Sequence, residues 1–460
     1  MAVGLRRPSQ AVDLNELIRL FPPPPEYFET AYFAPPEEIE RKQLARLRER
    51  ALTAYQVPFF RRRWDDAHWN PRELHSIDDL WRAPQYTIDD IRDSIEKNPP
   101  WGDYQGVTPE RARLEPMRIF MSGGTTGASR PTFYTQWDRE VHAILTARVH
   151  FAMGVRPGDV VLNSWLYGTH NGAFGIDEGL YRWLNCVILT TSTGTVTATE
   201  KQIELALQYG ASSVLATGDY LLRLADVARS MGVDPINDLK LKALATIGDP
   251  GPLEATFGRQ SLQAYGFHEL GWIAVECPAR QGLHIFEDAV IIQIVDPDTG
   301  EALPDGELGS VCVTEIYKTG SPQFRYNVQD LSFLHPREQC ACGSWLRRMA
   351  PFAGRGDNMV KLRGINVWPE AIGDVLRSVP DASKDYFVRA VRKGSRDELV
   401  ASVVTDKSQD HFAAIQQEAE RRLRDRLGVA ITVEVVKPGA LDQLTEIATS
   451  PKPKRFRDER

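Results

Sequence analysis

Short apolar runs alternate with amphipathic stretches through the middle of the chain. Residues 160–163, 186–189 and 213–216 have the pattern of buried strands. The spacing of apolar positions over residues 199–209 predicts a helix, with Thr199 as its N-terminal cap. Alternation of strand and helix favours βαβ units, in which ligands bind at the carboxyl ends of the strands. From about residue 100 to residue 350 we therefore predict an α/β fold built on βαβ sheets.

The pattern changes after residue 279. Residues 289–295 and 310–313 are β-rich and flank the turn-forming residues 296–300, which predicts an antiparallel β subdomain. Beyond about residue 357, helical patterns at 368–379 and 409–427 accompany strands near Tyr386 and Val433. This is enough for a small α+β domain.

The first 75 residues predict an irregular, partly helical segment with an amphipathic helix over residues 38–54. We thus expect a large N-terminal domain, residues 1–356, and a small C-terminal domain, residues 357–460.

Length and composition narrow the class of protein. A chain of 460 residues is too long for one hydrophobic core, and its 42% hydrophobic and 25% charged residues are ordinary for a globular protein. A formal net charge of −7 offers no general attraction to nucleic acid or to an anionic membrane. No apolar run approaches the roughly 20 residues that span a bilayer, and the first ten residues lack the apolar core of a secretory signal. Five cysteines make no disulfide framework. We expect a cytoplasmic protein without nucleic-acid or membrane partners.

One segment points to chemistry by its residue types alone. After the mostly apolar residues 117–120, three glycines and three hydroxyl residues fall within six positions: Ser122, Gly123, Gly124, Thr125, Thr126 and Gly127. A strand that leads into such a loop presents free backbone N–H groups and hydroxyl donors, which suit a polyphosphate. The Gly-Lys-Ser/Thr ending of a Walker A loop is missing. A flexible surface turn is the alternative.

Four further motifs follow in order. They are Tyr-Gly-Phe-His-Glu at 265–269, Phe-Arg-Tyr-Asn-Val-Gln-Asp-Leu at 324–331, Gly-Arg-Gly-Asp-Asn-Met at 354–359 and Arg-Gly-Ile-Asn-Val-Trp-Pro at 363–369. With the loop at 122–132, this order resembles the adenylate-forming superfamily, and within it the phenylacetate–CoA ligases. The similarity runs from about residue 58 to the C-terminus.

The resemblance implies roles for individual residues. Asp330 would accept hydrogen bonds from both ribose hydroxyls, and Arg355 would reach the ribose or a phosphate. Glu269 would hold Mg²⁺, a cation that prefers oxygen ligands. Four residues would border the adenine or the reacting carboxyl: Tyr265, Gly266, Gly248 and Asp249. Taken singly, each could equally be a turn, surface or linker residue.

The C-terminal tail carries the lysine that the resemblance predicts for adenylation. Lys452 aligns best, although the glycine that usually precedes it is missing, and Lys454 is the alternative. Its cation would stabilise charge on the five-coordinate phosphorus. Asp357 matches the hinge about which the small domain would rotate between two catalytic poses. A solvated basic tail and an ordinary linker turn are the competing interpretations.

Two positions depart from the family pattern. His268 stands where relatives carry a hydroxyl residue that touches the α-phosphate. Arg130, preceded by two additional residues, stands where relatives carry a lysine in the phosphate loop. Both changes keep hydrogen-bond donors near the phosphates, so we expect catalysis with an unusual acid or acceptor.

The acid pocket is expected at residues 165–175, where aromatic residues and glycines suit a flat, ring-bearing acid. The residues we assign to it are Tyr167, Gly168, His170, Asn171 and Phe174. His170 and Asn171 could bond substituents of the ring, or could satisfy a backbone group at the start of a helix.

A separate group comprises Cys277, His284, Cys340 and Cys342. Three thiolates and one imidazole make a closed tetrahedral set for structural Zn²⁺, and some relatives with a similar layout bind zinc. Reduced, unlinked cysteines are the alternative, and His335 could replace His284.

The sequence thus predicts an ATP-dependent ligase that activates a small aromatic carboxylic acid as its adenylate and passes it to coenzyme A. A first alternative is transfer to another acceptor, an amine or an inorganic nucleophile, in secondary metabolism. A second alternative is a non-catalytic homologue that binds a nucleotide or an acid. Assembly as a homodimer stays open.

Overall fold

The computed structural model describes residues 12–122, 130–246, 250–356, 360–362, 365–383, 385–393, 396–446 and 454–460. The chain divides into two units, one formed by residues 1–328 and 332–352 and the other by residues 329–331 and 353–460. The boundary that we predict at residues 356 and 357, and the mobility of the small domain, stay predictions.

The N-terminal part of the first unit is helical, as predicted. The predicted helix over 38–54 is α4, Pro36–Ala54, which begins earlier because Pro36 suits the first turn of a helix. Its buried residues recur every three or four positions on one face. The other helices here are α2 Leu14–Leu20, α3 Glu26–Glu29, α5 Pro58–Asp66, α6 Ile88–Lys97, α7 Pro109–Ala112 and the 3₁₀ turns Ala31–Phe33, Pro71–Glu73 and Asp78–Arg82.

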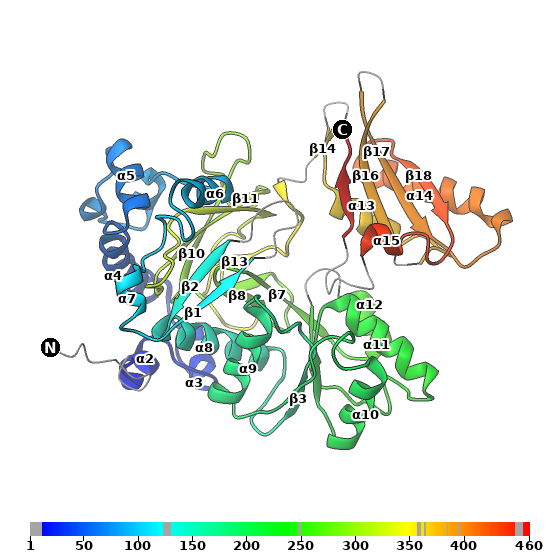
Figure 1. Cartoon of the computed structure of the whole chain (residues 1–460), viewed down its shortest axis with the longest axis horizontal. Coiled ribbons are helices and arrows are strands. Elements are labelled where there is room, and N and C mark those ends of the chain that lie inside the picture. The colour runs from blue at the N-terminus through cyan, green and yellow to red at the C-terminus, as the bar shows by residue number, and fades with distance from the viewer. Residues whose placement is uncertain are drawn as a thin grey trace. The chain divides into compact units, whose positions relative to one another are not determined.

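The predicted βαβ units are confirmed. Strand β3, Val160–Asn163, pairs in parallel with β4, Val187–Thr190, and with β5, Ser213–Leu215. The accompanying helices are α9 Gly172–Trp183, α10 Thr199–Tyr209 and α11 Gly218–Ser230 (Figure 1). The predicted cap of α10 is wrong: Thr199 is the first helical residue, and its hydroxyl lies 3.1 Å from that of Tyr220.

Two further sheets complete the large unit. A five-stranded sheet has the order β13-β9-β8-β7-β6 and a three-stranded sheet the order β10-β11-β12. Strands β10 and β11 are antiparallel, as predicted from the turn between them. The bounds are β6 Leu244–Thr246, β7 Ser261–Phe267, β8 Gly271–Glu276, β9 Leu283–Ile285, β10 Val290–Val295, β11 Gly309–Glu315, β12 Tyr326–Ser332 and β13 Arg348–Met349, with helix α12 at Gly251–Phe257.

A hairpin and a central helix position the candidate site. Strand β1, Met117–Met121, pairs antiparallel with β2, Pro131–Thr135, and helix α8, Gln136–Ala152, follows directly (Figure 1). Every residue of α8 from Asp138 to His150 is buried, so this helix lies inside the unit rather than on its surface.

The second unit is a small α+β structure with its own core. Its four-stranded sheet has the order β18-β17-β16-β19, and a two-stranded sheet pairs β14 with β15. Helices α13 and α14 supply buried residues to a core cluster that includes Ile372, Ala419 and Val403. The bounds are β14 Val360–Leu362, β15 Ile365–Val367, α13 Pro369–Leu376, β16 Tyr386–Lys393, β17 Arg396–Val404, α14 Phe412–Leu427, β18 Thr432–Val436, α15 Asp442–Thr445 and β19 Phe456–Asp458.

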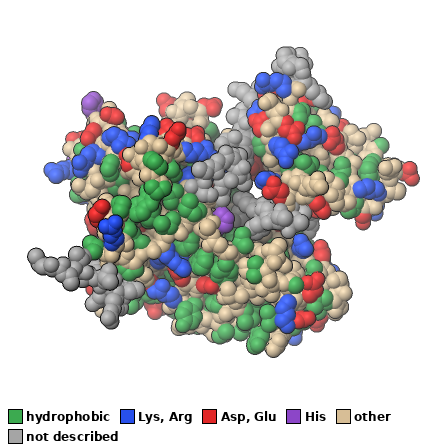
Figure 2. Space-filling model, viewed as in Figure 1, with side chains coloured by type: hydrophobic (Ala, Val, Ile, Leu, Met, Phe, Trp, Pro, Cys, Tyr) green, Lys and Arg blue, Asp and Glu red, His purple; other side chains and the backbone are tan. Residues whose placement is uncertain are grey.

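The surface of the described residues is mixed in charge. On the face that Figure 2 shows, Lys and Arg side chains are interspersed with Asp and Glu side chains on both units. Among the described helices, none is long and apolar enough to cross a membrane.

Candidate active site

The glycine-rich loop connects the two antiparallel strands β1 and β2. Its two described ends are bonded to each other: the Ser122 amide donates to the Arg130 carbonyl (3.1 Å), and the Arg130 amide donates to Ser122 Oγ (3.3 Å). The predicted residues Gly123, Gly124, Thr125, Thr126 and Gly127 lie outside the described residues. The predicted strand before the loop is confirmed.

The cation of this loop meets the predicted magnesium ligand. Arg130 Nη2 lies 3.4 Å from Glu269 Oε1, and the two side chains are 14% and 7% exposed. The fold thus joins two motifs that are 139 residues apart in the sequence. A distance of 3.4 Å is long for a charge-assisted hydrogen bond.

The segment at 265–269 is shaped by the hairpin between β7 and β8. A side chain at Gly266 would place its Cβ 2.2 Å from the Gly271 carbonyl oxygen, so only glycine fits there. The strand register shifts between Tyr265 and Gly266, and Tyr265 is buried. Burial lowers the pKa of His268, which keeps its imidazole neutral near pH 7.

Two residues that the sequence did not single out hold the backbone of Glu269. Tyr134 Oη donates to the Glu269 carbonyl (2.7 Å), and Lys318 Nζ donates to the same oxygen (2.8 Å). Both side chains are buried, and burial lowers the pKa of Lys318 to about 8. The sequence did offer a signal, because Lys318 is a lone cation three residues after the end of strand β11.

The predicted acid-binding segment is tied to the end of β1. The Met121 amide donates to the Thr169 carbonyl (2.8 Å), and His170 Nδ1 donates to the Met121 carbonyl (3.1 Å). His170 therefore satisfies a backbone group, although not at a helix start. A side chain added to Gly168 would meet no atom within 4 Å.

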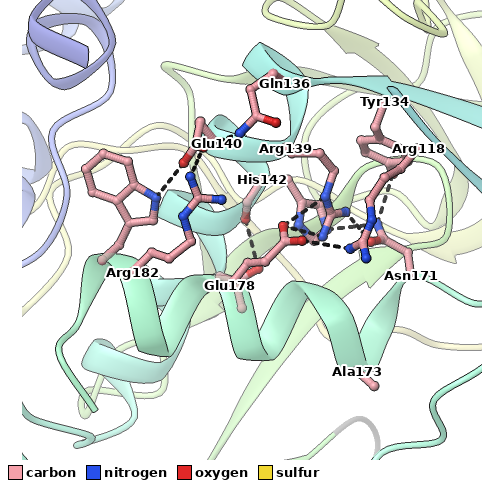
Figure 3. A network of polar contacts seen from close by, with 12 residues as sticks. Arg118, Tyr134, Gln136, Arg139, Glu140, His142, Asn171, Ala173, Glu178 and Arg182 are labelled. Carbon is pink, nitrogen blue, oxygen red and sulfur yellow. Dashed lines mark hydrogen bonds and ion pairs between the residues drawn. The ribbon is translucent and has the colours of Figure 1, made fainter. Parts of the chain in front are cut away.

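Aromatic side chains gather beside this segment. The Tyr167 ring meets the Phe174 ring edge to face, with centroids 5.3 Å apart, and Phe120 lies 5.7 Å from Phe174. The Tyr167 hydroxyl donates to Asp177 Oδ2 (2.6 Å). Asn171 precedes α9 and points into a polar network with Arg139, Tyr134 and His142 (Figure 3).

The second unit contains the predicted ribose ligands. Arg355 Nη1 lies 3.2 Å from Asp330 Oδ1, and the two residues form a β-bridge. Lys454, the alternative catalytic lysine, has its Nζ 2.5 Å from Glu446 Oε1. The predicted residues Gly248, Asp249, Asp357 and Lys452 lie outside the described residues.

The Cys/His group converges. The ligand atoms of Cys277, His284, Cys340 and Cys342 all lie within 4.8 Å of one another. The pKa of the Cys342 thiol is lowered, because the Cys277 thiol donates to it and His284 and Tyr32 add further hydrogen bonds. The alternative ligand His335 lies instead beside Gly282, outside the group.

Comparison with known proteins supports the class that these motifs define. The family model of the AMP-binding enzyme C-terminal domain matches residues 364–460. The fold is similar to that of a crystal structure of 2-hydroxyisobutyryl-CoA ligase with a bound acyl-AMP (TM-score 0.82, 24% identity, 93% of this chain and 91% of that chain). The chain has the fold of adenylate-forming enzymes.

Curated relatives define the family more closely. Phenylacetate–coenzyme A ligase of Thermus thermophilus is 32% identical over 435 residues, which cover 88% of this chain and 94% of the relative. The enzyme of the same name from Pseudomonas putida is 31% identical over 420 residues, 88% of this chain and 92% of the relative. The chain belongs to the phenylacetate–coenzyme A ligase family and is an AMP-forming acid–thiol ligase.

Proposed function

We propose that the protein activates a small aromatic carboxylic acid with ATP and transfers it to coenzyme A. A carboxylate oxygen of the acid attacks the α-phosphorus of ATP, and pyrophosphate leaves. The sulfur of coenzyme A then attacks the acyl carbon, the thiol loses its proton, and AMP leaves. Adenylation replaces a poor leaving group by a good one, which divides a difficult reaction into two easier steps.

The pairing of Arg130 with Glu269 carries this proposal. A phosphate loop needs its cation close to the metal that neutralises the same phosphates, and the two side chains are 3.4 Å apart. Glu269 suits Mg²⁺ because it offers carboxylate oxygens, which this cation prefers. Bound Mg²⁺ would neutralise phosphate charge. Arg130 and the Ser122 hydroxyl would orient the phosphates.

The relatives' name and the local aromatic residues together support an aromatic acid. Two relatives are named for phenylacetate, and the rings of Phe120, Tyr167 and Phe174 lie around the predicted acid segment. Such rings favour stacked or edge-to-face contact with a flat ligand. In the second unit, we propose that Asp330 and Arg355 bind the ribose and that Lys452 serves adenylation, delivered by rotation at Asp357.

We further propose that the Cys/His group binds structural Zn²⁺. Tetrahedral zinc with Zn–S bonds of about 2.3 Å and a Zn–N bond of about 2.0 Å places sulfurs about 3.8 Å apart and sulfur and nitrogen about 3.5 Å apart. Cys277 Sγ lies 3.7 Å from Cys340 Sγ, and His284 Nε2 lies 3.5 Å from Cys342 Sγ. Both of these distances match those of a loaded site, and all four ligand atoms lie within 4.8 Å of one another.

The function is tested by pyrophosphate release with a panel of acids: phenylacetate, benzoate, hydroxybenzoates and aminobenzoates. Each acid is assayed with and without coenzyme A, and the thioester is measured by mass spectrometry. Acid-dependent pyrophosphate and an aryl thioester are expected, both lost in Glu269→Gln. Pyrophosphate release without a thioester would point to another acceptor. Binding of ATP without release for any acid would point to a non-catalytic homologue.

A further inference from the structure

Protein groups bond both the oxygen and the nitrogen of the Asn171 side-chain amide. Its Oδ1 accepts from the Arg139 guanidinium, and its Nδ2 donates to Tyr134 Oη (3.1 Å) and to His142 Nε2 (3.0 Å). An asparagine amide has two N–H donors, so both are used. The side chain is buried and makes no helix-cap hydrogen bond. A substrate acceptor could bond the amide nitrogen only if one of its two hydrogen bonds broke.

The hydrogen bonds have a fixed direction. Because Arg139 can only donate, Oδ1 of Asn171 must face it, and the N–H groups must face Tyr134 and His142 (Figure 3). Tyr134 accepts from Asn171 and has one proton of its own to donate. That proton is directed at the main-chain carbonyls of Glu269 (2.7 Å) and His268 (3.0 Å).

The network extends from Asn171 to the aromatic rings of the acid segment. Arg139 also donates to Glu178 Oε2 through Nε (2.9 Å) and Nη2 (2.6 Å), and Arg118 Nη1 donates to Glu178 Oε1 (2.9 Å). The Arg118 guanidinium lies 4.8 Å from the centroid of the Phe174 ring. An unbroken chain of contacts therefore joins Phe174 to the carbonyl of Glu269.

We propose that Asn171 is a positioning residue that couples binding of the acid to binding of Mg·ATP, acting through Tyr134 on the peptide of Glu269. Occupation of the segment at 167–174 holds Asn171, Asn171 orients the Tyr134 hydroxyl, and that hydroxyl fixes the Glu269 carbonyl together with Lys318. This inference rests on the proposed function.

The substitution Asn171→Asp reverses the direction of the hydrogen bond to Tyr134 while it leaves the shape of the side chain almost unchanged. The new carboxylate still pairs with Arg139, but it can only accept, so it draws the Tyr134 proton away from the Glu269 carbonyl. Tyr134→Phe removes the link altogether and serves if the first variant does not fold. Gln202→Glu is the matched control, because this buried amide also has its oxygen bonded by Ser164 and both N–H groups bonded, to Ser192 and Thr197.

Binding of Mg·α,β-methylene-ATP, which is not cleaved at the α-phosphate, is measured by calorimetry with and without saturating phenylacetate. In the wild-type enzyme we expect the acid to tighten nucleotide binding at least about fivefold, as coupled sites do. This factor, the ratio of the nucleotide dissociation constants without and with phenylacetate, should approach one in Asn171→Asp and Tyr134→Phe. It should stay at the wild-type value in Gln202→Glu. In the variant that carries both Asn171→Asp and Tyr134→Phe, it should be no smaller than in Tyr134→Phe alone.

Either of two results would overturn the inference: no coupling in the wild-type enzyme, or an unchanged factor in Asn171→Asp and Tyr134→Phe. Pyrophosphate release by the wild-type enzyme separates this failure from failure of the proposed function. If the wild-type enzyme releases pyrophosphate and the substitutions leave the coupling factor unchanged, only the role of Asn171 is wrong.

Discussion

Arg130 Nη2 lies 3.4 Å from Glu269 Oε1, so the cation that ends the phosphate loop faces the carboxylate predicted to hold magnesium. Relatives are expected to use a lysine at the loop position. A guanidinium can bond a carboxylate and a phosphate together, because it presents several donors in a fixed fork. The unusual residue in the loop therefore suits the place where the fold puts it.

Replacing this arginine should weaken nucleotide binding. In Arg130→Met we expect the KM for ATP in pyrophosphate release to rise about tenfold or more, since a hydrogen bond to a charged group contributes about 1.5–3 kcal/mol. Arg130→Lys should recover part of the loss. Arg280→Met is the control, because Arg280 pairs with Glu254 on the surface of the same unit. Equal KM values for Arg130→Met and the control would contradict the assignment.

The two tail lysines should behave differently. Lys454 Nζ lies 2.5 Å from Glu446 Oε1, within the second unit, so we expect it to stabilise the tail. Lys452→Ala should slow adenylation at least about 100-fold, as loss of a charge that stabilises the transition state does. Lys454→Ala should change it less than about threefold. The assay is single-turnover pyrophosphate release, and the reverse order of the two effects would make Lys454 the catalytic residue.

Low pH should destabilise the large unit, because two histidines of helix α8 are buried. Burial lowers the pKa of His150 to about 4, while Nδ1 of the ring donates to the Thr146 carbonyl (2.8 Å). Below pH 6.5 the unfolded chain binds a proton that the folded chain excludes, so stability falls as pH falls from 6.5 to about 4, by about 3 kcal/mol for this group. His142 contributes with the same sign, because burial lowers its pKa as well.

Urea unfolding at pH 7.5 and pH 4.5 measures this loss. The difference between the two pH values should be smaller in His150→Gln than in the wild-type enzyme. An identical pH dependence in both would show that His150 is protonated equally in the folded and unfolded chains.

Removal of zinc should destabilise the β subdomain and the N-terminal segment together. Tyr32 Oη lies 3.4 Å from Cys342 Sγ, and Ser344 Oγ donates to the Tyr32 carbonyl (2.7 Å). One equivalent of zinc is expected by elemental analysis, and a chelator or Cys342→Ser should lower the melting temperature and expose residues 12–35 to protease. The reason is that the free energy of metal binding adds to the stability of the fold when the site forms only in the folded chain. Zinc content below about 0.1 equivalent in protein purified without chelator would argue for reduced, unlinked cysteines.

Periodicity, turn chemistry and motif order determined much of this protein. Residues 160–163 and 199–209 form the predicted strand and helix, because a buried parallel strand and an amphipathic helix have distinct apolar periods. The order of the motifs was enough to identify the family. Even His284, rather than His335, was the preferred ligand of the Cys/His group from the sequence.

Only the tertiary structure decided which buried side chains contact the motif residues. Asn171 has the sequence context of a substrate ligand, yet Tyr134 and His142 use both N–H donors of its amide and Arg139 bonds its oxygen. Lys318 reaches the Glu269 carbonyl from 49 residues away. Such contacts depend on which buried side chains face one another across packed elements. Local sequence patterns carry no information about how far apart two side chains from different elements lie or which way they point.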